Sequence, residues 1–229
     1  MSEVKNYEIQ MIDIKEAILR DNDEEAAAIR RELKEKKTFM VNLMASPGAG
    51  KTSLLTQTAR SMKNEYAIGV VEGDIESMVD SYKMAAEDVE TVQIRTGGSC
   101  HLDAAMIRHG LDKLDLDKLD LVFIENIGNL VCPAEFDTGA DLRVMILSVP
   151  EGDDKPLKYP LMFSVCDCLI VNKADYLPDP GFDLTKMESY VRKLNPDIKI
   201  IPLSCRQGTG VGEWCEWLKE KIEGKFTTA

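Results

Sequence analysis

The strongest chemical signal in the sequence is a turn of small residues that joins an apolar run to a Lys-Thr pair. Val41–Ala45 has the character of a buried strand, Ser46–Gly50 is the turn, and Lys51 opens a helical pattern. Small residues let backbone N–H groups converge on phosphate oxygens, and a helix N-terminus adds a positive dipole. In such a loop the Lys reaches the β- and γ-phosphates and the Thr hydroxyl ligates Mg²⁺. The residues expected to contact a nucleotide here are Pro47, Gly48, Ala49, Gly50, Lys51, Thr52 and Ser53.

One position departs from the usual pattern of this loop, G-x-x-x-x-G-K-[ST]. Ala45 stands where the first Gly is expected, whereas the core Gly48–Thr52 is complete. Ala is small enough for the end of a strand, so a phosphate-binding loop remains the prediction. The alternative is a helix that begins with Gly-Lys-Thr and binds no nucleotide.

A second motif, Asn172-Lys173-Ala174-Asp175, follows a later apolar run. The carboxylate of Asp175 would accept hydrogen bonds from the N1–H and the exocyclic amine of guanine, a pair of donors that adenine lacks. Asn-Lys-x-Asp also begins ordinary helices, but its place downstream of a phosphate loop favours guanine binding. The residues expected to contact the base region are Asn172, Lys173, Asp175 and, at the end of the next strand, Ser204 and Cys205.

Two acidic strand ends are expected to handle Mg²⁺. Glu72-Gly73-Asp74 follows one apolar run, with Glu76 and Asp80 close behind, and Glu125-Asn126-Ile127-Gly128 follows another. The second string has the position of a D-x-x-G switch, in which a carboxylate holds the metal through a water and the Gly N–H swings to the γ-phosphate. Asp74 is expected to bind metal or to orient the attacking water. Asp80 is explained equally well as part of a solvated helix face.

These positions give a set of predicted roles. The expected catalytic residues are Lys51, Asp74 and Glu125, and the expected Mg²⁺ ligands are Thr52, Asp74 and Glu125. Gly128 is followed by Asn129, where Ras-like enzymes place a Gln that orients water. Slow intrinsic hydrolysis is therefore predicted, as suits a switch.

A thiol and imidazole set stands near these motifs. Cys100 and His101 follow a Gly-rich turn, and Cys132 lies just downstream of the second switch. Such a soft N/S set suits Zn²⁺ or Ni²⁺. Three ligands are too few for a closed tetrahedral site, so water, another side chain or a second subunit must complete it. The alternative is a buried loop Cys beside a helix-capping neighbour.

The other cysteines and the second histidine are expected to have structural roles. Cys166 and Cys168 are one residue apart on an apolar strand approach, so they are expected to face the same side and to be buried. Burial is also expected for Cys215, which has two Trp neighbours on a helix. His109 is expected to be an ordinary residue at a helix end.

Strand and helix patterns alternate from residue 38 onward, which predicts an α/β domain with a mostly parallel sheet covered on both faces. The expected strands are Thr38–Met44, Ala67–Val71, Thr91–Ile94, Leu119–Ile124, Val144–Val149, Cys168–Val171 and Lys199–Leu203. The expected helices span 52–63, 76–87, 101–114, 157–164, 183–194 and 211–223. Ligands bind at the carboxyl ends of the strands in such sheets, so the motifs are expected to meet there.

Residues 1–37 are predicted to form a helical N-terminal extension to a GTP-binding domain of residues 38–229. Their apolar spacing indicates two helices, with a break and an N-cap at Asp21-Asn22-Asp23. Packing on the edge of the main domain is one interpretation. A docking or dimerisation arm is the other.

Composition limits the classes of function. The 229 residues carry a net charge of −12, which argues against nucleic acid as the main partner. No apolar run approaches the length of a membrane span, and the acidic start does not resemble a signal peptide, so a cytoplasmic protein without membrane association is expected. The six cysteines are then expected to be thiols.

Taken together, these motifs resemble the hydrogenase nickel-incorporation GTPases of the HypB family from about residue 38 to the end. The matching strings are SPGAGKT (46–52), EGDIES (72–77), GSCHLDA (98–104), ENIGNLVCPAEFD (125–137) and EGDDKPLKYP (151–160). The resemblance implies a three-layer P-loop NTPase fold of the signal-recognition-particle and MinD-like group. It also implies a homodimer in which Cys100, His101 and Cys132 bind nickel or zinc at the subunit interface.

The same resemblance implies that GTP, GDP and Mg²⁺ bind, and that GTP loading and hydrolysis govern dimerisation and metal transfer. The implied partners are a HypA-type nickel chaperone and the large-subunit precursor of a [NiFe]-hydrogenase. Some family members carry a Cys-rich or His-rich N-terminal nickel tail. Residues 1–37 contain neither residue type, so no separate storage site is expected there.

Three alternatives are weighed against this assignment. A urease accessory GTPase would share the loop, but its metal motif resembles Cys-Pro-His, whereas no His follows Cys132-Pro133 here. A small-molecule kinase has no need to select guanine through Asn172–Asp175. A partner-binding module that retains a nucleotide pocket would bind GTP without metal-responsive hydrolysis.

Overall fold

The computed structural model describes residues 14–74, 87, 89–177 and 181–227. Within these residues the strands are β1 (Phe39–Ala45), β2 (Ile68–Asp74), β3 (Glu90–Arg95), β4 (Leu121–Glu125), β5 (Leu142–Ser148), β6 (Cys168–Asn172) and β7 (Lys199–Pro202). The helices are α1 (Ile14–Lys36), α2 (Lys51–Met62), α4 (Ala104–Leu111), α5 (Cys132–Glu135), α6 (Lys155–Lys158), α7 (Pro160–Val165), α8 (Leu184–Leu194) and α9 (Val211–Thr227). Short 3₁₀ turns lie at Leu116–Lys118, Val149–Glu151 and Ala174–Tyr176.

The described strands form one sheet in the order β3-β2-β4-β1-β5-β6-β7, and every neighbouring pair is parallel. The strand β1 is central, between β4 and β5. Because all strands run the same way, the segments that follow their carboxyl ends share one edge of the sheet. The predicted parallel α/β architecture is confirmed, and all seven predicted strands are present.

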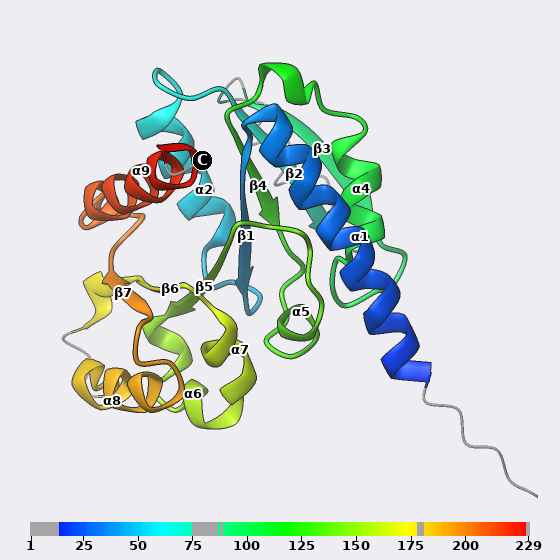
Figure 1. Ribbon diagram of the computed structural model, residues 1–229. Coiled ribbons are helices and arrows are strands. Elements are labelled where there is room, and N and C mark those ends of the chain that lie inside the picture. Colours follow the sequence, from blue (N-terminus) through cyan, green and yellow to red (C-terminus); the bar gives the residue numbers. More distant parts are fainter. Residues whose placement is uncertain (1–13, 75–86, 88, 178–180, 228–229) are drawn as a thin grey trace, which may run out of the picture.

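Helices cover both faces of the sheet (Figure 1). Alternate residues of β1 separate the two faces: Val41 and Leu43 pack in a core cluster with α2 and α9, whereas Met40 packs with α1 and α4. On the same side as Met40, Met44 packs with α7 and α8. The result is the three-layer arrangement that alternating strands and helices predict.

The N-terminal segment differs from the prediction. A single helix, α1, runs without interruption through Asp21–Asp23, so the predicted break is wrong. The apolar stripe of Ala26, Ile29 and Leu33 is buried against α4, and Asn22 lies on the same buried side with its amide bonded to distant backbone groups. Tertiary contacts therefore satisfy the side chain of Asn22, which lies in the middle of the predicted break.

Other helices agree with the prediction in place and differ in extent. The helix predicted at 101–114 begins only at Ala104, because the Asp103 side chain accepts from the Met106 N–H at 2.8 Å and caps it. The segment predicted at 157–164 is divided into α6 and α7 at Tyr159, immediately before Pro160. Most of the helix predicted at 76–87, including Glu76 and Asp80, lies outside the described residues.

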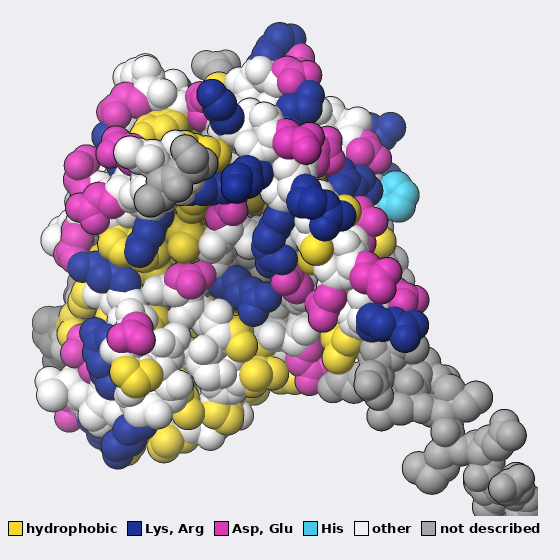
Figure 2. Space-filling view, viewed as in Figure 1, with side chains coloured by type: hydrophobic (Ala, Val, Ile, Leu, Met, Phe, Trp, Pro, Cys, Tyr) yellow, Lys and Arg dark blue, Asp and Glu magenta, His cyan; other side chains and the backbone are white. Residues whose placement is uncertain are grey.

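Two features of the described chain bear on its environment. None of the described helices combines the length and the apolar character needed to span a membrane. Acidic and basic side chains are interspersed over the face that carries α1 and α9 (Figure 2), so the described side chains form no continuous basic surface there.

Candidate nucleotide and metal sites

The phosphate loop connects β1 to α2 as predicted. The helix α2 begins at Lys51, so the first backbone N–H groups of a helix face the loop. A cavity of about 470 Å³ opens above it, lined by Pro47, Gly48, Gly50 and Lys51–Ser53 from the loop and by the ends of β2 and β4. Ala49 is buried, and its carbonyl oxygen accepts a hydrogen bond from Asn172.

The cavity above the phosphate loop has the ligand chemistry of a magnesium site. Thr52 Oγ1 donates to Glu125 Oε1 at 2.7 Å, and Asp74 lines the same cavity. Glu72, which the sequence analysis did not select, also lines it, is only 3% exposed, and pairs in register with Glu125 on the adjacent strand. Hydroxyl and carboxylate oxygens are the ligands that Mg²⁺ prefers, so this set fits the ion. The strand register is the signal that would have identified Glu72.

The switch glycine lies directly against the phosphate loop. A side chain at Gly128 would meet the backbone nitrogen of Pro47 at 2.9 Å. Only a glycine allows this close approach of the two backbones. The segment after β4 is therefore positioned to respond to a group bound at the phosphate loop.

A second cavity, of about 590 Å³, contains the predicted base-contacting residues. Asn172 Nδ2 donates to the Ala49 carbonyl at 2.9 Å, and Asn172 Oδ1 accepts from the Cys205 N–H at 3.2 Å. Lys173 Nζ donates to the Gly48 carbonyl at 2.9 Å, and Ser204 Oγ donates to Asp175 Oδ1 at 2.6 Å. All five predicted residues meet there. Its further lining residues, which the sequence analysis did not select, are Thr56, Gln57, Pro150, Tyr176 and Arg206.

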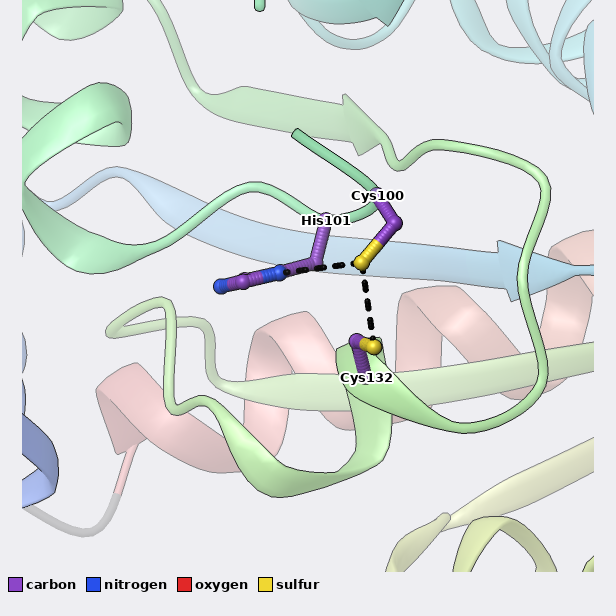
Figure 3. A group of neighbouring side chains, drawn as sticks. All are labelled: Cys100, His101 and Cys132. Atoms are coloured by element: carbon purple, nitrogen blue, oxygen red, sulfur yellow. Dashed lines mark hydrogen bonds between the residues drawn. The ribbon is translucent and has the colours of Figure 1, made fainter. Parts of the chain in front are cut away.

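The predicted metal ligands also come together (Figure 3). The sulfur atoms of Cys100 and Cys132 lie 3.1 Å apart, and Cys100 Sγ is 3.8 Å from His101 Nδ1. One ligand atom from each of the three residues lies within 4.8 Å of the others. This is the separation at which one soft ion binds all three groups.

The ligands differ in their surroundings. The His101 ring stacks on Phe136 with the ring centroids 3.9 Å apart. Burial lowers the pKa of His101, an effect that Asp103 and Glu135 oppose, so the imidazole is neutral and able to ligate at neutral pH. The hydrogen bond with Cys100, together with burial, raises the pKa of Cys132. A metal ion that binds Cys132 must therefore displace the proton of its thiol.

Two asparagine side chains of the switch segment after β4 are hydrogen-bonded to the loop that carries Cys100 and His101. Asn126 Oδ1 accepts from the Leu102 N–H at 3.1 Å, while its Nδ2 donates to Asn42 Oδ1 on β1 at 3.2 Å. Asn129 Nδ2 donates to the Cys100 carbonyl at 3.2 Å. The amide of Asn126 is buried within the core of the protein. Neither contact was predicted, because the partners are distant in sequence.

Cys166, Cys168 and Cys215 are buried, as predicted, and Cys205, which lines the second cavity, is buried as well. Burial raises the pKa values of Cys166, Cys168 and Cys215, and that of Cys205 to about 11, so all four thiols are protonated at neutral pH. The prediction that Cys166 and Cys168 face the same side is wrong. Cys166 precedes β6 and packs with α7 and α8, whereas Cys168 packs with α2 and α9 on the opposite face.

The fold and the two cavities define the chain as a P-loop nucleotide-binding domain. Residues 39–202 match the family model described as "CobW/HypB/UreG, nucleotide-binding domain". The fold of signal recognition particle 54 kDa protein from Aeropyrum pernix is similar, with a TM-score of 0.54 at 14% identity over 82% of this chain and 49% of that one.

Two relatives define the family more closely. The hydrogenase maturation factor HypB of Azotobacter vinelandii is 47% identical over 212 residues, which are 93% of this chain and 70% of that protein. HypB from Helicobacter pylori, solved in complex with nickel, has a TM-score of 0.86 at 37% identity and covers 90% of this chain and 97% of that one. The chain belongs to the HypB family of hydrogenase maturation factors.

Proposed function

We propose that this protein is a GTP-hydrolysing metallochaperone that binds nickel, or zinc at the same site, and delivers nickel during [NiFe]-hydrogenase maturation. One observation carries the proposal: Asn126 and Asn129, in the segment that follows Glu125, are hydrogen-bonded to the backbone of Leu102 and Cys100, in the loop that carries two of the three clustered metal ligands. The loop of the soft-metal site is thereby bonded to a segment that also lines the phosphate cavity. The nickel complex of the Helicobacter pylori relative supports the choice of ion.

The residues of the two cavities have separate roles in GTP hydrolysis. Lys51 stabilises the charge on the β- and γ-phosphates, and Thr52, Asp74 and Glu125 hold Mg²⁺. When bound, the ion neutralises the phosphate oxygens as charge develops on them. Asp175, oriented by the Ser204 hydroxyl, selects guanine. Glu72 joins these carboxylates as a further candidate ligand, on the grounds of its burial and its register with Glu125.

Slow hydrolysis is part of the proposal. The Asn129 side chain accepts from the Val131 N–H at 2.9 Å and donates to the Cys100 carbonyl. The oxygen and the nitrogen of the Asn129 amide are thus both hydrogen-bonded to backbone next to the metal ligands. The corresponding Gln of Ras-like enzymes instead orients the attacking water.

The nucleotide and the metal are coupled through this segment. Loss of the γ-phosphate relaxes Glu125–Asn129, and this shift moves Cys132, which lies three residues beyond Asn129. Thermodynamic reciprocity then requires bound metal to change nucleotide affinity. GTP hydrolysis in this way determines when the metal is released.

The proposed assembly is a cytoplasmic homodimer. Three ligands from one chain leave a coordination position that a second copy, water or the recipient can fill. The proposed partners are a HypA-type nickel chaperone and a [NiFe]-hydrogenase large-subunit precursor, with no nucleic acid and no membrane. Residues 38–229 form the GTP-binding domain, and residues 1–37 are its N-terminal extension.

Delivery of nickel to urease is a second candidate. A relative from Helicobacter hepaticus, 39% identical over 220 residues, is named a "Hydrogenase/urease maturation factor HypB". A hydrogenase alone is preferred here, because the urease-type Cys-Pro-His motif is absent from the sequence at Cys132-Pro133.

The coupling is tested by titrating Ni²⁺ and Zn²⁺ into the GTP-loaded and GDP-loaded protein. We expect the two states to differ in affinity by at least about 5-fold, and Cys132→Ala to abolish the difference. Cys215→Ala, which removes a buried thiol outside the site, is the matched control and should retain it. Equal affinities in both states, unaltered by Cys132→Ala, would contradict the proposal.

A further inference from the structure

The helix α1 is part of the core beside the metal loops. Its buried residues Ala26, Ile29 and Leu33 share one hydrophobic cluster with Ile107 and Leu111 of α4. Figure 1 shows α1 lying along α4, the helix that begins just after Cys100 and His101. The helix is therefore close enough to support the loops that carry the ligands.

A single side chain of α1 binds both ligand-bearing segments. Asn22 Oδ1 accepts from the Ala104 N–H at 2.9 Å, and Asn22 Nδ2 donates to the Asp137 carbonyl at 2.9 Å. Asn22 is only 8% exposed, so both hydrogen bonds are protected from water. An amide is suited to this position because it carries one donor end and one acceptor end.

Both partners of Asn22 lie close to metal ligands. Ala104 is the first residue of α4 and lies three positions after His101. Asp137 ends the segment that starts at Cys132, and it follows Phe136, whose ring stacks on His101. Asn22 therefore connects the backbone that follows Cys100 and His101 to the backbone that follows Cys132.

A second contact fixes the Asp137 end of this bridge. Arg30 of α1 donates to both carboxylate oxygens of Asp137, at 2.5 and 2.6 Å. Gly139 packs so tightly on α1 that a Cβ there would lie 2.8 Å from Ile29 Cγ2. Burial raises the pKa of Asp137, but the hydrogen bonds from Arg30 and from the Gly139 N–H outweigh it and leave the pKa lowered. The carboxylate is thus charged, and the segment is held to α1.

We infer that Asn22 is a positioning residue of the metal centre, because it fixes the spacing between the Cys100-His101 loop and the Cys132 segment. Metal–ligand distances tolerate changes of only about 0.2 Å, so an ion responds to small shifts between the two loops. The inference rests on the proposed metal site and gives the N-terminal extension a role in it. On this basis α1 is a structural support of the metal centre.

The test compares nickel binding by full-length variants, with NiSO₄ titrated against a competing chelator and the nickel–thiolate charge-transfer absorption recorded. Asn22→Ala removes both hydrogen bonds and is expected to weaken nickel binding by about 10-fold or more and to alter the absorption band. Asn22→Asp still accepts from the Ala104 N–H but cannot donate to the Asp137 carbonyl. It is expected to produce a smaller loss.

The matched control is Leu33→Ala on the same helix. Leu33 is 1% exposed, and its loss should lower the thermal unfolding midpoint at least as much as Asn22→Ala while leaving nickel affinity unchanged. Wild-type affinity and absorption in the folded Asn22 variants would overturn the inference, and so would an equal loss of affinity in Leu33→Ala. If Asn22→Ala does not fold, Asn22→Asp decides the question.

Cys132→Ala separates this inference from the proposed function. If Cys132→Ala binds nickel as the wild type does, the proposed metal site itself is wrong. If Cys132→Ala loses nickel and the Asn22 variants keep it, only the role of Asn22 is wrong.

Discussion

The nucleotide site and the metal site lie at the same edge of the sheet but are constructed differently. Around the nucleotide, Asn172 and Lys173 bond backbone carbonyls of the phosphate loop, so one strand end braces another. Cys100 and His101 project from the loop before α4, Cys132 lies at the first position of the short helix α5, and Cys100 is exposed. Asparagine amides from neighbouring elements hold those segments in place. The base-binding part of the nucleotide site is held by contacts among its own residues, whereas the metal site depends on supports that lie outside it.

This difference suits a carrier. A nucleotide pocket must select one base and needs fixed geometry. A metal that is to be passed on needs ligands whose spacing changes in response to a signal. The contacts that hold the metal ligands come from α1 and from the segment after β4, so a shift of either element can change the spacing of the ligands without disturbing the sheet.

The largest expected effect comes from a substitution that alters the nucleotide site and leaves the metal site unchanged. Asp175→Asn replaces the carboxylate that would accept from guanine with an amide that presents a donor. Since a hydrogen bond to a charged group contributes about 1.5–3 kcal/mol, GTP affinity should fall by about 10- to 100-fold. Xanthosine triphosphate, which offers an acceptor in place of the exocyclic amine, should gain affinity. Competition between the two nucleotides measures this, and unchanged preference for GTP would remove Asp175 from base recognition.

An intermediate effect is expected where the two sites are joined. Asn126→Ala removes the acceptor of the buried Leu102 and Ile127 N–H groups, which should cost about 1–3 kcal/mol of unfolding free energy. The nickel affinities of the GTP-loaded and GDP-loaded forms should also converge. Urea unfolding and nickel titration test the two parts. The control is Asn64→Ala, an exposed asparagine in the turn after α2, and a coupling that survives in Asn126→Ala would show that another route connects the sites.

The smallest expected effect concerns the ion pair between Arg30 of α1 and Asp137, and it depends on pH. Because the folded-state pKa of Asp137 is lowered, its pairing with Arg30 stabilises the protein above the unfolded pKa of about 3.9. That contribution disappears as pH falls through the lower folded pKa. Arg30→Met should therefore lower the free energy of unfolding by about 1 kcal/mol or less near pH 6. Near pH 2.5 the decrease should be smaller, and urea unfolding at the two pH values measures both. A difference that stays constant with pH would exclude this pairing as its source.

The sequence was most informative where function resides in contiguous residues. The phosphate loop and Asn172–Asp175 each place several contacts within one short string, so strand position and residue type were sufficient to predict them. The parallel sheet followed from continuous apolar runs, since strands buried on both faces lack the alternation of half-exposed ones.

The errors and omissions involve contacts between distant residues. Asp21-Asn22-Asp23 looked like a break with a helix cap because Asp and Asn favour that position, and only the fold reveals that the Asn22 amide bonds two segments 82 and 115 residues away. Glu72 was passed over for Asp74, because register with Glu125 is a property of the sheet rather than of either strand. The contacts of Asn126 and Asn129 likewise depend on how the segment after β4 meets the loop after β3 across the end of β2, which lies between these two strands in the sheet.

The family model begins at residue 39, just after α1 ends at Lys36. The matched residues, 39–202, contain the phosphate loop and all three thiol and imidazole ligands, but they exclude Asn22 and Arg30 at one end and Ser204 and Cys205 at the other. A nucleotide-binding unit that starts at β1 would retain the proposed catalytic residues but would lack the contacts of α1 with the segments that carry the metal ligands. The side chains that we infer to position the metal ligands thus lie outside the matched nucleotide-binding region.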